Sequence, residues 1–510
     1  MNANSNRCMT DRKKIALLWL MAAFSVSVAA QPYDRVERRN FWNAGSNVTG
    51  LRMDSLTVSY AELYGRYEAG GFRDTHEAAR AWSAGAVAKT ITHSERYSMT
   101  GSFSFDNTSG SDMCGSMFIR PGFYPVDVLE FTPGRKDLQT YAFMGGIAVD
   151  VASCWRVGGK MDFAAANYAK RKDLRHMNYR LDMKVAPAVM YHRGDAAVGI
   201  SYLFGKNSES VKAEEIGTTT AAYYAFLDKG LMYGAYEVWT GSGVHLNETG
   251  MDAFPVSELS NGVGVQVQFG NFYGDAEYVG SSGKVGEKET VWFRFARHGI
   301  SSRLGYRIAR GGRSHFLRFR LDWEYLSNNE NVLGKETANG VTVTKVYGSN
   351  RIFERTWVTA NPEYGFTGPR GEFTAGVQVS SLRRMSFQMF PYVMSQNLVQ
   401  ARIYASGIWN VGRFDIGAGA AFAAGGFSDG QLEAATDMEP GEPPFHLERY
   451  YDMQNEYMTA PRITVHCSLR YNFLHGMYAE AAASYVRGFR LRFIGGADRW
   501  CGTLRIGYTF

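Results

Sequence analysis

The strict alternation of apolar and polar side chains over long stretches constrains this chain more than any other feature. Between residues 317 and 325 every odd position is apolar and every even position is charged, and between residues 463 and 473 every odd position is again apolar. A period of two places the two sets on opposite faces of a β-strand. The second stretch runs for about 12 residues, whereas transmembrane strands need ~9–11 and soluble strands average ~5–6. The pattern therefore favours strands that cross a bilayer.

Such strands follow one another with short connections, as at Gly270-Asn271, Gly311-Gly312 and His475-Gly476. We expect 287–297 and 300–310 to be two successive strands of this meander. The predicted fold is all-β, a single large antiparallel transmembrane β-barrel with an even strand number, about 18 and within roughly 14 to 20. Short periplasmic turns and long extracellular loops should connect the strands. The predicted loops are 108–138, 209–260, 328–350 and 426–459.

The N-terminal residues resemble a secretory signal. Arg7, Arg12, Lys13 and Lys14 precede an apolar run over 15–30 that ends in small residues. The run is shorter than the ~20 residues of a spanning helix, so residues 1–30 are predicted to be a cleavable signal peptide. We expect residues 31–52 to be a periplasmic or lumen-inserted lead-in, 53–510 to be the barrel, and the chain to be exported to a bacterial outer membrane.

The last strand carries the most specific signal. Leu504, Ile506, Tyr508 and Phe510 share one face, and the last residue is aromatic. This pattern is similar to the C-terminal signal by which outer-membrane barrels are recognised by their assembly machinery. It predicts that Arg505 faces the lumen, and that the partners include the barrel-assembly machinery, outer-membrane lipid and lipopolysaccharide.

Two further segments carry a family resemblance. Residues 39–51 read Arg-Asn-Phe-Trp, then Gly-Ser-Asn-Val-Thr-Gly-Leu from Gly45, and residues 172–178 read Lys-Asp-Leu-Arg-His-Met-Asn. Both resemble an uncharacterised family of Bacteroidota outer-membrane β-barrels, a domain of unknown function, although Leu174 stands where a proline is expected. The resemblance implies fold and location, and implies no substrate and no catalytic residue.

Five arginines form the main candidate site, a basic patch on the lumen wall that should favour anionic solutes. They are Arg294, Arg303, Arg307, Arg318 and Arg320. The alternative is that Asp322, Glu324 and other acids neutralise them in a network that stiffens the wall.

No enzymatic or metal-binding motif occurs. Carboxylates crowd 426–459, but their spacing matches no metal loop, and the four cysteines beyond Cys8 fit no zinc pattern. His466 and Ser468 share a strand face at roughly 7 Å, which is long for a nucleophile and its base. A net charge of +6 over 510 residues is too balanced to indicate nucleic acid. We therefore expect no enzyme activity, cofactor or metal.

Two hypotheses about function remain. The first is a porin-like channel for small solutes. The second is a non-transporting surface scaffold, or a partner of an uptake receptor; a barrel-embedded hydrolase is a remote alternative. Occupancy of the lumen separates the first two, because a plug formed by 31–50 or 108–138 favours a scaffold or a gated channel. Oligomeric state is left open.

Overall fold

The structure is a computed structural model that describes residues 40–172, 174–214, 225–231, 235–238, 250–287, 290–339, 341–387, 393–432 and 447–510. The predicted signal peptide lies outside the described residues. The elements, in chain order, are η1 Phe41–Ala44, η2 Val48–Met53, β1 Val58–Gly70, β2 Arg80–His93, β3 Tyr97–Ser116, β4 Asp127–Ala152, β5 Trp155–Lys170, β6 Arg175–Arg193, β7 Ala196–Glu214, β8 Ala225–Gly230, β9 Ala235–Val238, β10 Gly250–Phe269, β11 Phe272–Gly286, β12 Val291–Arg310, β13 Arg313–Ala338, β14 Val341–Gly368, β15 Gly371–Phe387, β16 Val393–Val411, β17 Phe414–Leu432, α3 Leu447–Thr459, β18 Arg462–Asn472, η3 Leu474–Gly476, β19 Met477–Gly488 and β20 Asp498–Thr509.

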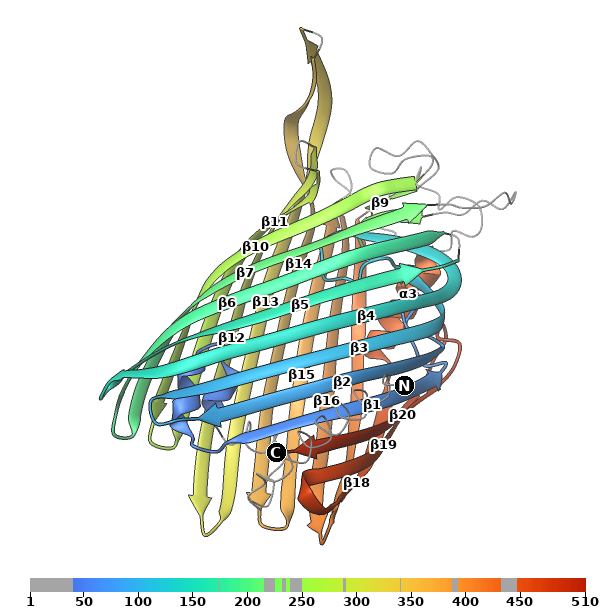
Figure 1. The fold of residues 1–510 in the computed structure, drawn as a ribbon. Helices are drawn as coiled ribbons and strands as arrows, with labels where there is room; N and C mark the ends of the chain where they lie inside the picture. The colour runs from blue at the N-terminus through green and yellow to red at the C-terminus, as the bar shows by residue number, and fades with distance from the viewer. Residues whose placement is uncertain are drawn as a thin grey trace, which may run out of the picture.

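Eighteen of these strands close an antiparallel barrel (Figure 1). Each wall strand pairs with its neighbour along the chain, β7 pairs with β10, and β1 pairs with β20 to close the sheet. The two remaining strands lie outside this ring of pairings, since β8 pairs with β4 and with β9. The predicted all-β barrel and its strand number of about 18 are confirmed.

Two details of the predicted strand pattern are wrong. The stretches 287–297 and 300–310 belong to one strand, β12, whose pairing with β13 continues unbroken through His298 and Gly299. The predicted strand 385–394 is divided between the end of β15 and the start of β16. Glycine favours turns, which explains the predicted break at Gly299, but Gly299 keeps its place in the ladder opposite Glu324. The predicted loop 328–350 is also mostly strand, because β13 and β14 extend through it.

The two ends of the barrel differ in their connections. The turns at 153–154, 194–195, 270–271, 311–312 and 412–413 are very short, and Val58 and Phe510 lie at the same end. We call this the short-turn end. The opposite end, the long-loop end, carries the connections 71–79, 117–126 and 489–497 among the described residues.

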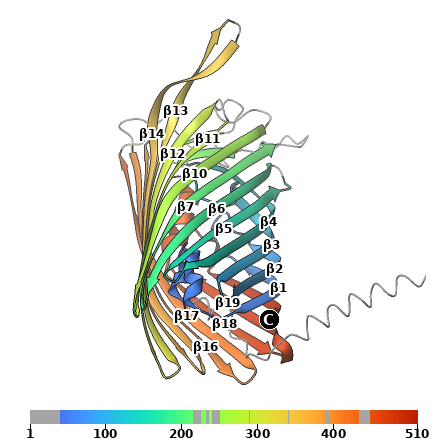
Figure 2. The ribbon, with the colours of Figure 1, turned by 60° about the vertical axis from the view of Figure 1, so that its left-hand side comes forward.

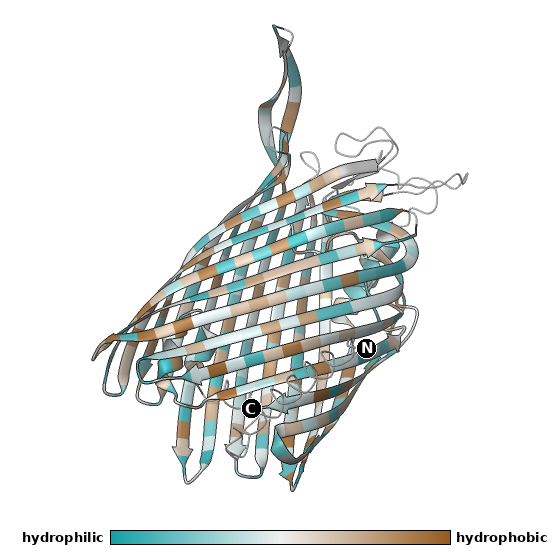
Figure 3. Cartoon of the chain, in the orientation of Figure 1, coloured by the Kyte–Doolittle hydropathy of each residue, from teal (hydrophilic) through white to brown (hydrophobic). Residues whose placement is uncertain are grey.

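The outer face of the wall is apolar. Apolar residues recur along successive strands, as the brown bands in Figure 3 show. Many of their large side chains have about half of their surface exposed. Examples are Ile300, Leu304, Leu317, Phe319, Val379, Ile403 and Leu504. Soluble proteins rarely expose a continuous apolar surface of this extent, so the wall is built to face lipid. Within the described residues, no helix is both long and apolar enough to span a bilayer.

One hairpin projects far beyond the barrel. The ends of β13 and β14 pair with each other out to Ala338 and Val341 and rise above the other strands at the long-loop end (Figures 1 and 2). Their register shifts after Asn328 and again after Val332, at the base of the projection. Both irregularities lie where the ribbon leaves the wall.

Candidate functional site in the lumen

Residues 40–53 lie inside the lumen near the short-turn end (Figure 2). They form two 3₁₀ helices, η1 and η2. Asn40 Oδ1 accepts a hydrogen bond from Trp42 N at the start of η1, and Asn47 Oδ1 accepts one from Thr49 N at the start of η2. Trp42 is buried and packs with Met190, Ala197 and Tyr273 on the inner wall. Its indole Nε1 donates to Gln268 Oε1 at 2.6 Å. The close approach of Gly50 to Trp42 leaves no space for a Cβ atom, which explains this glycine.

Polar contacts fix the same segment to several strands. Ser46 N donates to the Glu277 carboxylate on β11 at 2.8 Å, and Asn47 Nδ2 donates to Val189 O on β6 at 3.3 Å. Arg52 forms an ion pair with Asp150 on β4. We call residues 40–53 the N-segment. It occupies the lumen from the short-turn end.

A second segment enters the lumen from the long-loop end. Residues 117–126, between β3 and β4, fold inward and bury Met117, Phe118 and Tyr124. They pack against inward-facing residues of the wall, which are Val211, Phe254, Val256, Val285, Phe293, Phe295, Leu326 and Phe353. We call residues 117–126 the inner loop. Burial raises the pKa of Tyr124, so its hydroxyl keeps the proton that it donates to Asn207 at 2.5 Å.

The tip of the inner loop is held by two wall arginines that the sequence analysis missed. Arg297 donates to Phe123 O at 3.0 Å, and its guanidinium lies 4.2 Å from the centre of the Phe123 ring. Arg355 donates to the carbonyl oxygens of Gly122 and Phe123. Glu324 accepts from both arginines, at 3.2 and 2.7 Å. We call Arg297, Glu324 and Arg355 the tip clamp.

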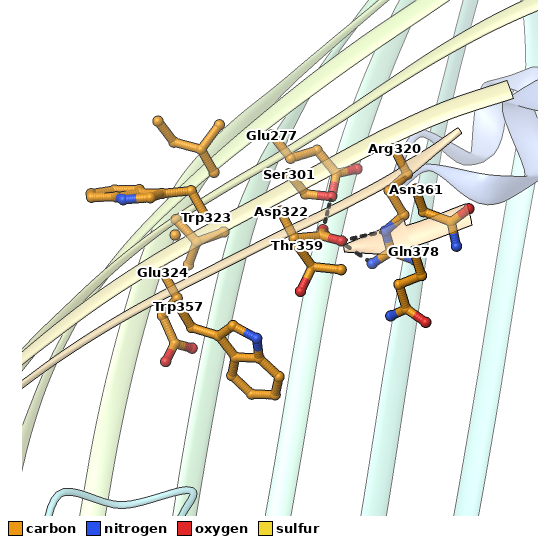
Figure 4. Close-up of a pocket in the computed structure, with 13 residues that line it drawn as sticks. Glu277, Ser301, Arg320, Asp322, Trp323, Glu324, Trp357, Thr359, Asn361 and Gln378 are labelled. Atoms are coloured by element: carbon orange, nitrogen blue, oxygen red, sulfur yellow. Dashed lines mark hydrogen bonds and ion pairs between the residues drawn. The ribbon is translucent and has the colours of Figure 1, made fainter. Parts of the chain in front are cut away.

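A chamber of about 560 Å³ with both polar and apolar lining residues lies on the inner side of β11–β15 (Figure 4). Its lining includes Glu277, which binds the N-segment, and Glu324, which belongs to the tip clamp, so it lies between the two inserted segments. Asp322 accepts from Ser301 at 2.8 Å and from Arg320 at 2.7 Å. Trp357, opposite Glu324 in the register, also borders it.

The predicted basic patch is only partly assembled. Arg303, Arg318 and Arg320 face the lumen. Arg303 forms ion pairs with Asp275 and Glu277. Arg318 pairs with Glu363, and Arg320 pairs with Asp322. Arg307 also faces inward, close to the short-turn end, where it lies opposite Phe316. Three of the five arginines therefore take part in a balanced network of the kind considered as the alternative.

Arg294 lies on the other face. The register of β12 is continuous from Phe293 to Arg310, so Arg294 shares the outer face with Ile300 and Leu304. Phe293 and Phe295 point inward because the inner loop fills the lumen there with apolar side chains. Placing Arg294 in the lumen assumed that apolar residues always face lipid, which fails beside the inner loop.

Trp357 and the two arginines of the tip clamp were not predicted, because no local pattern distinguishes them. Arg297 lies directly before His298-Gly299, the two residues between the predicted strands 287–297 and 300–310. Its even spacing from Arg303 and Arg307 is a signal for the inward face, but that signal can be used only once β12 is known to be one strand.

A buried charge cluster lies near the long-loop end of β4 and β5. Glu130 Oε1 lies 3.1 Å from Lys136 Nζ, and Glu130 Oε2 lies 2.5 Å from Lys170 Nζ, with all three side chains fully buried. The ammonium groups also donate to the backbone oxygens of Ser116 and Thr132. In the described part of the chain, no group of three or more His, Cys, Asp or Glu is placed to hold a metal ion.

The four residues of the predicted C-terminal signal lie on β20 and at the residue that follows it. Leu504, Ile506 and Phe510 are strongly exposed on the outer face, and Tyr508 stacks on Phe510. Phe510 and Ser59 exchange backbone hydrogen bonds at 2.9 and 3.1 Å where β20 meets β1. Arg505, on the opposite face, forms ion pairs with Glu480 and Glu62.

A family model of unknown function, DUF6850, matches residues 48–510, which is most of the chain. The chain belongs to the DUF6850 family. No curated protein matches it in sequence. Solved structures that are similar to the DUF6850 barrel include the following two. The pyoverdine-bound FpvA of P. aeruginosa shows 8% identity, a TM-score of 0.41 and coverage of 89% of this chain and 72% of that one. BauA, the ferric preacinetobactin receptor of Acinetobacter baumannii, shows 7% identity, a TM-score of 0.40 and coverage of 89% and 80%. Similarity at this level carries no functional inference.

Proposed function

We propose that the protein is an outer-membrane channel for small solutes whose pathway is closed, in this conformation, by the N-segment and the inner loop. The observation that carries the proposal is the chamber between the two segments, whose lining includes carboxylate, amide and hydroxyl groups. A barrel that served only to anchor or display loops would have no need for a cavity lined by carboxylates, amides and hydroxyl groups, since buried polar groups are costly unless they are paired or hydrated.

The tip clamp supports closure by a removable barrier. The inner loop is tied to the wall at its tip through carbonyl oxygens of Gly122 and Phe123, which are backbone groups that water can also bind. Hydrogen bonds to charged donors contribute ~1.5–3 kcal/mol each. A ligand or partner that binds the open form more tightly than the closed form by a similar amount would shift the population towards it.

The second candidate is a surface scaffold or a partner of an uptake receptor. It is favoured by the apolar core at the long-loop end, where the inner loop, β8 and the wall bury Phe118, Leu227, Phe254 and Phe293 almost completely. A core packed in this way resists opening. The two candidates therefore differ in whether the inner loop leaves the lumen.

Replacing Arg355 by Ala tests the channel. The substitution removes the donor to Gly122 O and one of the two donors to Phe123 O, and it leaves Glu324 with one partner, so the inner loop should open more often. We expect channel openings in planar bilayers to become at least about tenfold more frequent, since ~1.4 kcal/mol corresponds to a factor of ten. Arg383→Ala is the matched control, because Arg383 is an exposed arginine on the neighbouring strand, β15, with Met385 as its hydrogen-bond partner.

Liposome swelling with a graded series of neutral sugars provides the second measurement. The channel proposal expects faster swelling of Arg355→Ala liposomes for the smaller sugars, with Arg383→Ala matching the unmodified barrel. If the Arg355→Ala barrel is folded, by its heat-modifiable mobility in gels, and neither conducts nor swells, the channel is excluded and the scaffold is favoured.

We further propose that the C-terminal residues act as a signal for the barrel-assembly machinery, in a membrane that contains lipopolysaccharide. Phe510→Ser removes the exposed terminal ring and leaves the backbone bonds to Ser59 available. Folded barrel in the outer-membrane fraction should fall severalfold. Refolding of the same variant from urea into detergent should be nearly unchanged. A loss in both assays would indicate a structural role for the ring instead.

A further inference from the structure

Trp357 is an unusual residue for the inside of the barrel. In the register of β13 and β14 it lies opposite Glu324, and along β14 it shares the inner face with Thr359 and Asn361. Figure 4 shows its indole on the opposite side of the strands from Trp323, which lies on the outer face. Its exposed fraction is 47%. Tryptophan contributes a large apolar surface, and here that surface faces the chamber instead of lipid or a packed core.

The charges around this ring are neutralised by partners in the wall. Glu277 lies 3.4 Å from Arg303, Asp322 lies 2.7 Å from Arg320, and Glu324 accepts from both arginines of the tip clamp. A charged solute would have to compete with these ion pairs. The chamber therefore offers hydrogen bonds without a strong preference for either sign of charge.

Groups that bind hydroxyls extend away from the ring along the same wall. Thr359 and Asn361 follow Trp357 at alternate positions of β14, so the three side chains span roughly 13 Å at ~3.3 Å per residue. Gln378 on β15 and Ser301 on β12 border the same cavity. The set combines amide, hydroxyl and carboxylate groups, and so contains both donors and acceptors.

We propose that the chamber binds a neutral oligosaccharide, with a sugar ring stacked on Trp357 and its hydroxyl groups bonded to Thr359, Asn361 and Gln378. A pyranose has one face rich in C–H groups, which packs on an indole, and a rim of hydroxyls that both donate and accept. A purely apolar solute would offer no partner to the Thr359 hydroxyl and the Gln378 amide. A charged solute would have to compete with the ion pairs that Asp322, Glu277 and Glu324 already form in the wall. The inference rests on the proposed function, since it names the class of solute that the channel admits.

The test is isothermal titration calorimetry on the full chain in detergent, with maltohexaose, cellohexaose and mannohexaose as probes. The unmodified chain and the Arg355→Ala barrel are both titrated, so that access through the inner loop is not limiting. We expect one of the hexasaccharides to bind with a dissociation constant at or below about 1 mM. Trp357→Ala should weaken that binding about tenfold or more, and Trp357→Phe should restore part of it. Trp409→Ala is the matched control, because Trp409 lies on the outer face with an exposed fraction of 49% and should leave the affinity unchanged.

Glucose 6-phosphate, citrate and toluene are the chemical controls. The proposal is overturned if none of the three hexasaccharides binds either barrel, if Trp357→Ala binds as tightly as the unmodified chain, or if only a charged or an apolar control binds. Failure here is distinguishable from failure of the channel. If the Arg355→Ala barrel conducts but binds no sugar, the channel proposal stands and the proposed solute class is wrong. If a barrel binds sugar but never conducts, the binding site stands and the channel proposal is wrong.

Discussion

Replacing Glu130 by Gln should strongly destabilise the barrel, because Glu130 is the carboxylate of a fully buried ion-pair cluster. The change keeps the size of the side chain but removes the only carboxylate that pairs with Lys136 and Lys170 among the residues that the structure describes, and both ammonium groups are fully buried. Removing one partner of a buried pair costs ~3–5 kcal/mol, because a charge is left without compensation away from water. We expect a clear drop in the temperature at which the heat-modifiable band of the folded barrel disappears.

The control is Glu336→Gln in the projecting hairpin. Glu336 also forms an ion pair with a lysine, Lys345, at 3.1 Å, but both side chains are half-exposed. Exposed ion pairs are screened by water and salt, so this variant should melt with the unmodified barrel. Equal melting of Glu130→Gln and Glu336→Gln would show that the buried cluster is not strongly coupled to folding.

The second large effect is expected for Trp42→Ala. Trp42 is buried against Tyr273 and Met190 and bonded to Gln268, so its loss removes the main contact of the N-segment with the wall. Truncation of a buried tryptophan costs ~3–5 kcal/mol. The released state of the N-segment should become about a hundredfold or more populated. Release of the N-segment separates Arg52 from Asp150, so the rate of tryptic cleavage after Arg52 measures how often the N-segment is released.

Trp500→Ala serves as the control for this prediction. Trp500 lies on the outer face and packs with Tyr67, and among the residues that the structure describes it does not contact the N-segment. Cleavage after Arg52 should stay slow in that variant. If Trp42→Ala is cleaved no faster than Trp500→Ala, the polar contacts of Ser46, Asn47 and Arg52 are sufficient to hold the N-segment, and the aromatic contact is dispensable.

The sequence predicted the wall well and the contents of the lumen poorly. Alternation over 317–325 identifies two faces of a strand, and in β13 the apolar face does meet lipid. Alternation alone does not say what each face touches. Beside the inner loop the inward side chains of β12 are phenylalanines, so the same rule put Arg294 on the wrong side. Inward and outward faces can be told apart only when it is known where the lumen is filled.

The candidate site needed contacts between distant parts of the chain. The tip clamp joins β12, β13 and β14 to a loop that lies well over a hundred residues earlier. Trp357 looks like any aromatic residue of a strand until the register places it opposite Glu324. Neither the tip clamp nor the position of Trp357 can be predicted from a short stretch of sequence, because both depend on strand pairing and on the path of the inner loop.

The pairing of β1 with β20 has a consequence for the timing of folding. The two strands are the first and last of the wall, so the bonds between Tyr60 and Thr509 join opposite ends of the barrel sequence. Contacts between residues so far apart form late, because a long loop must be ordered before they are gained. The sheet therefore stays open until β20 pairs with β1. The N-segment and the inner loop can pack against the inner wall before this last pairing closes the barrel.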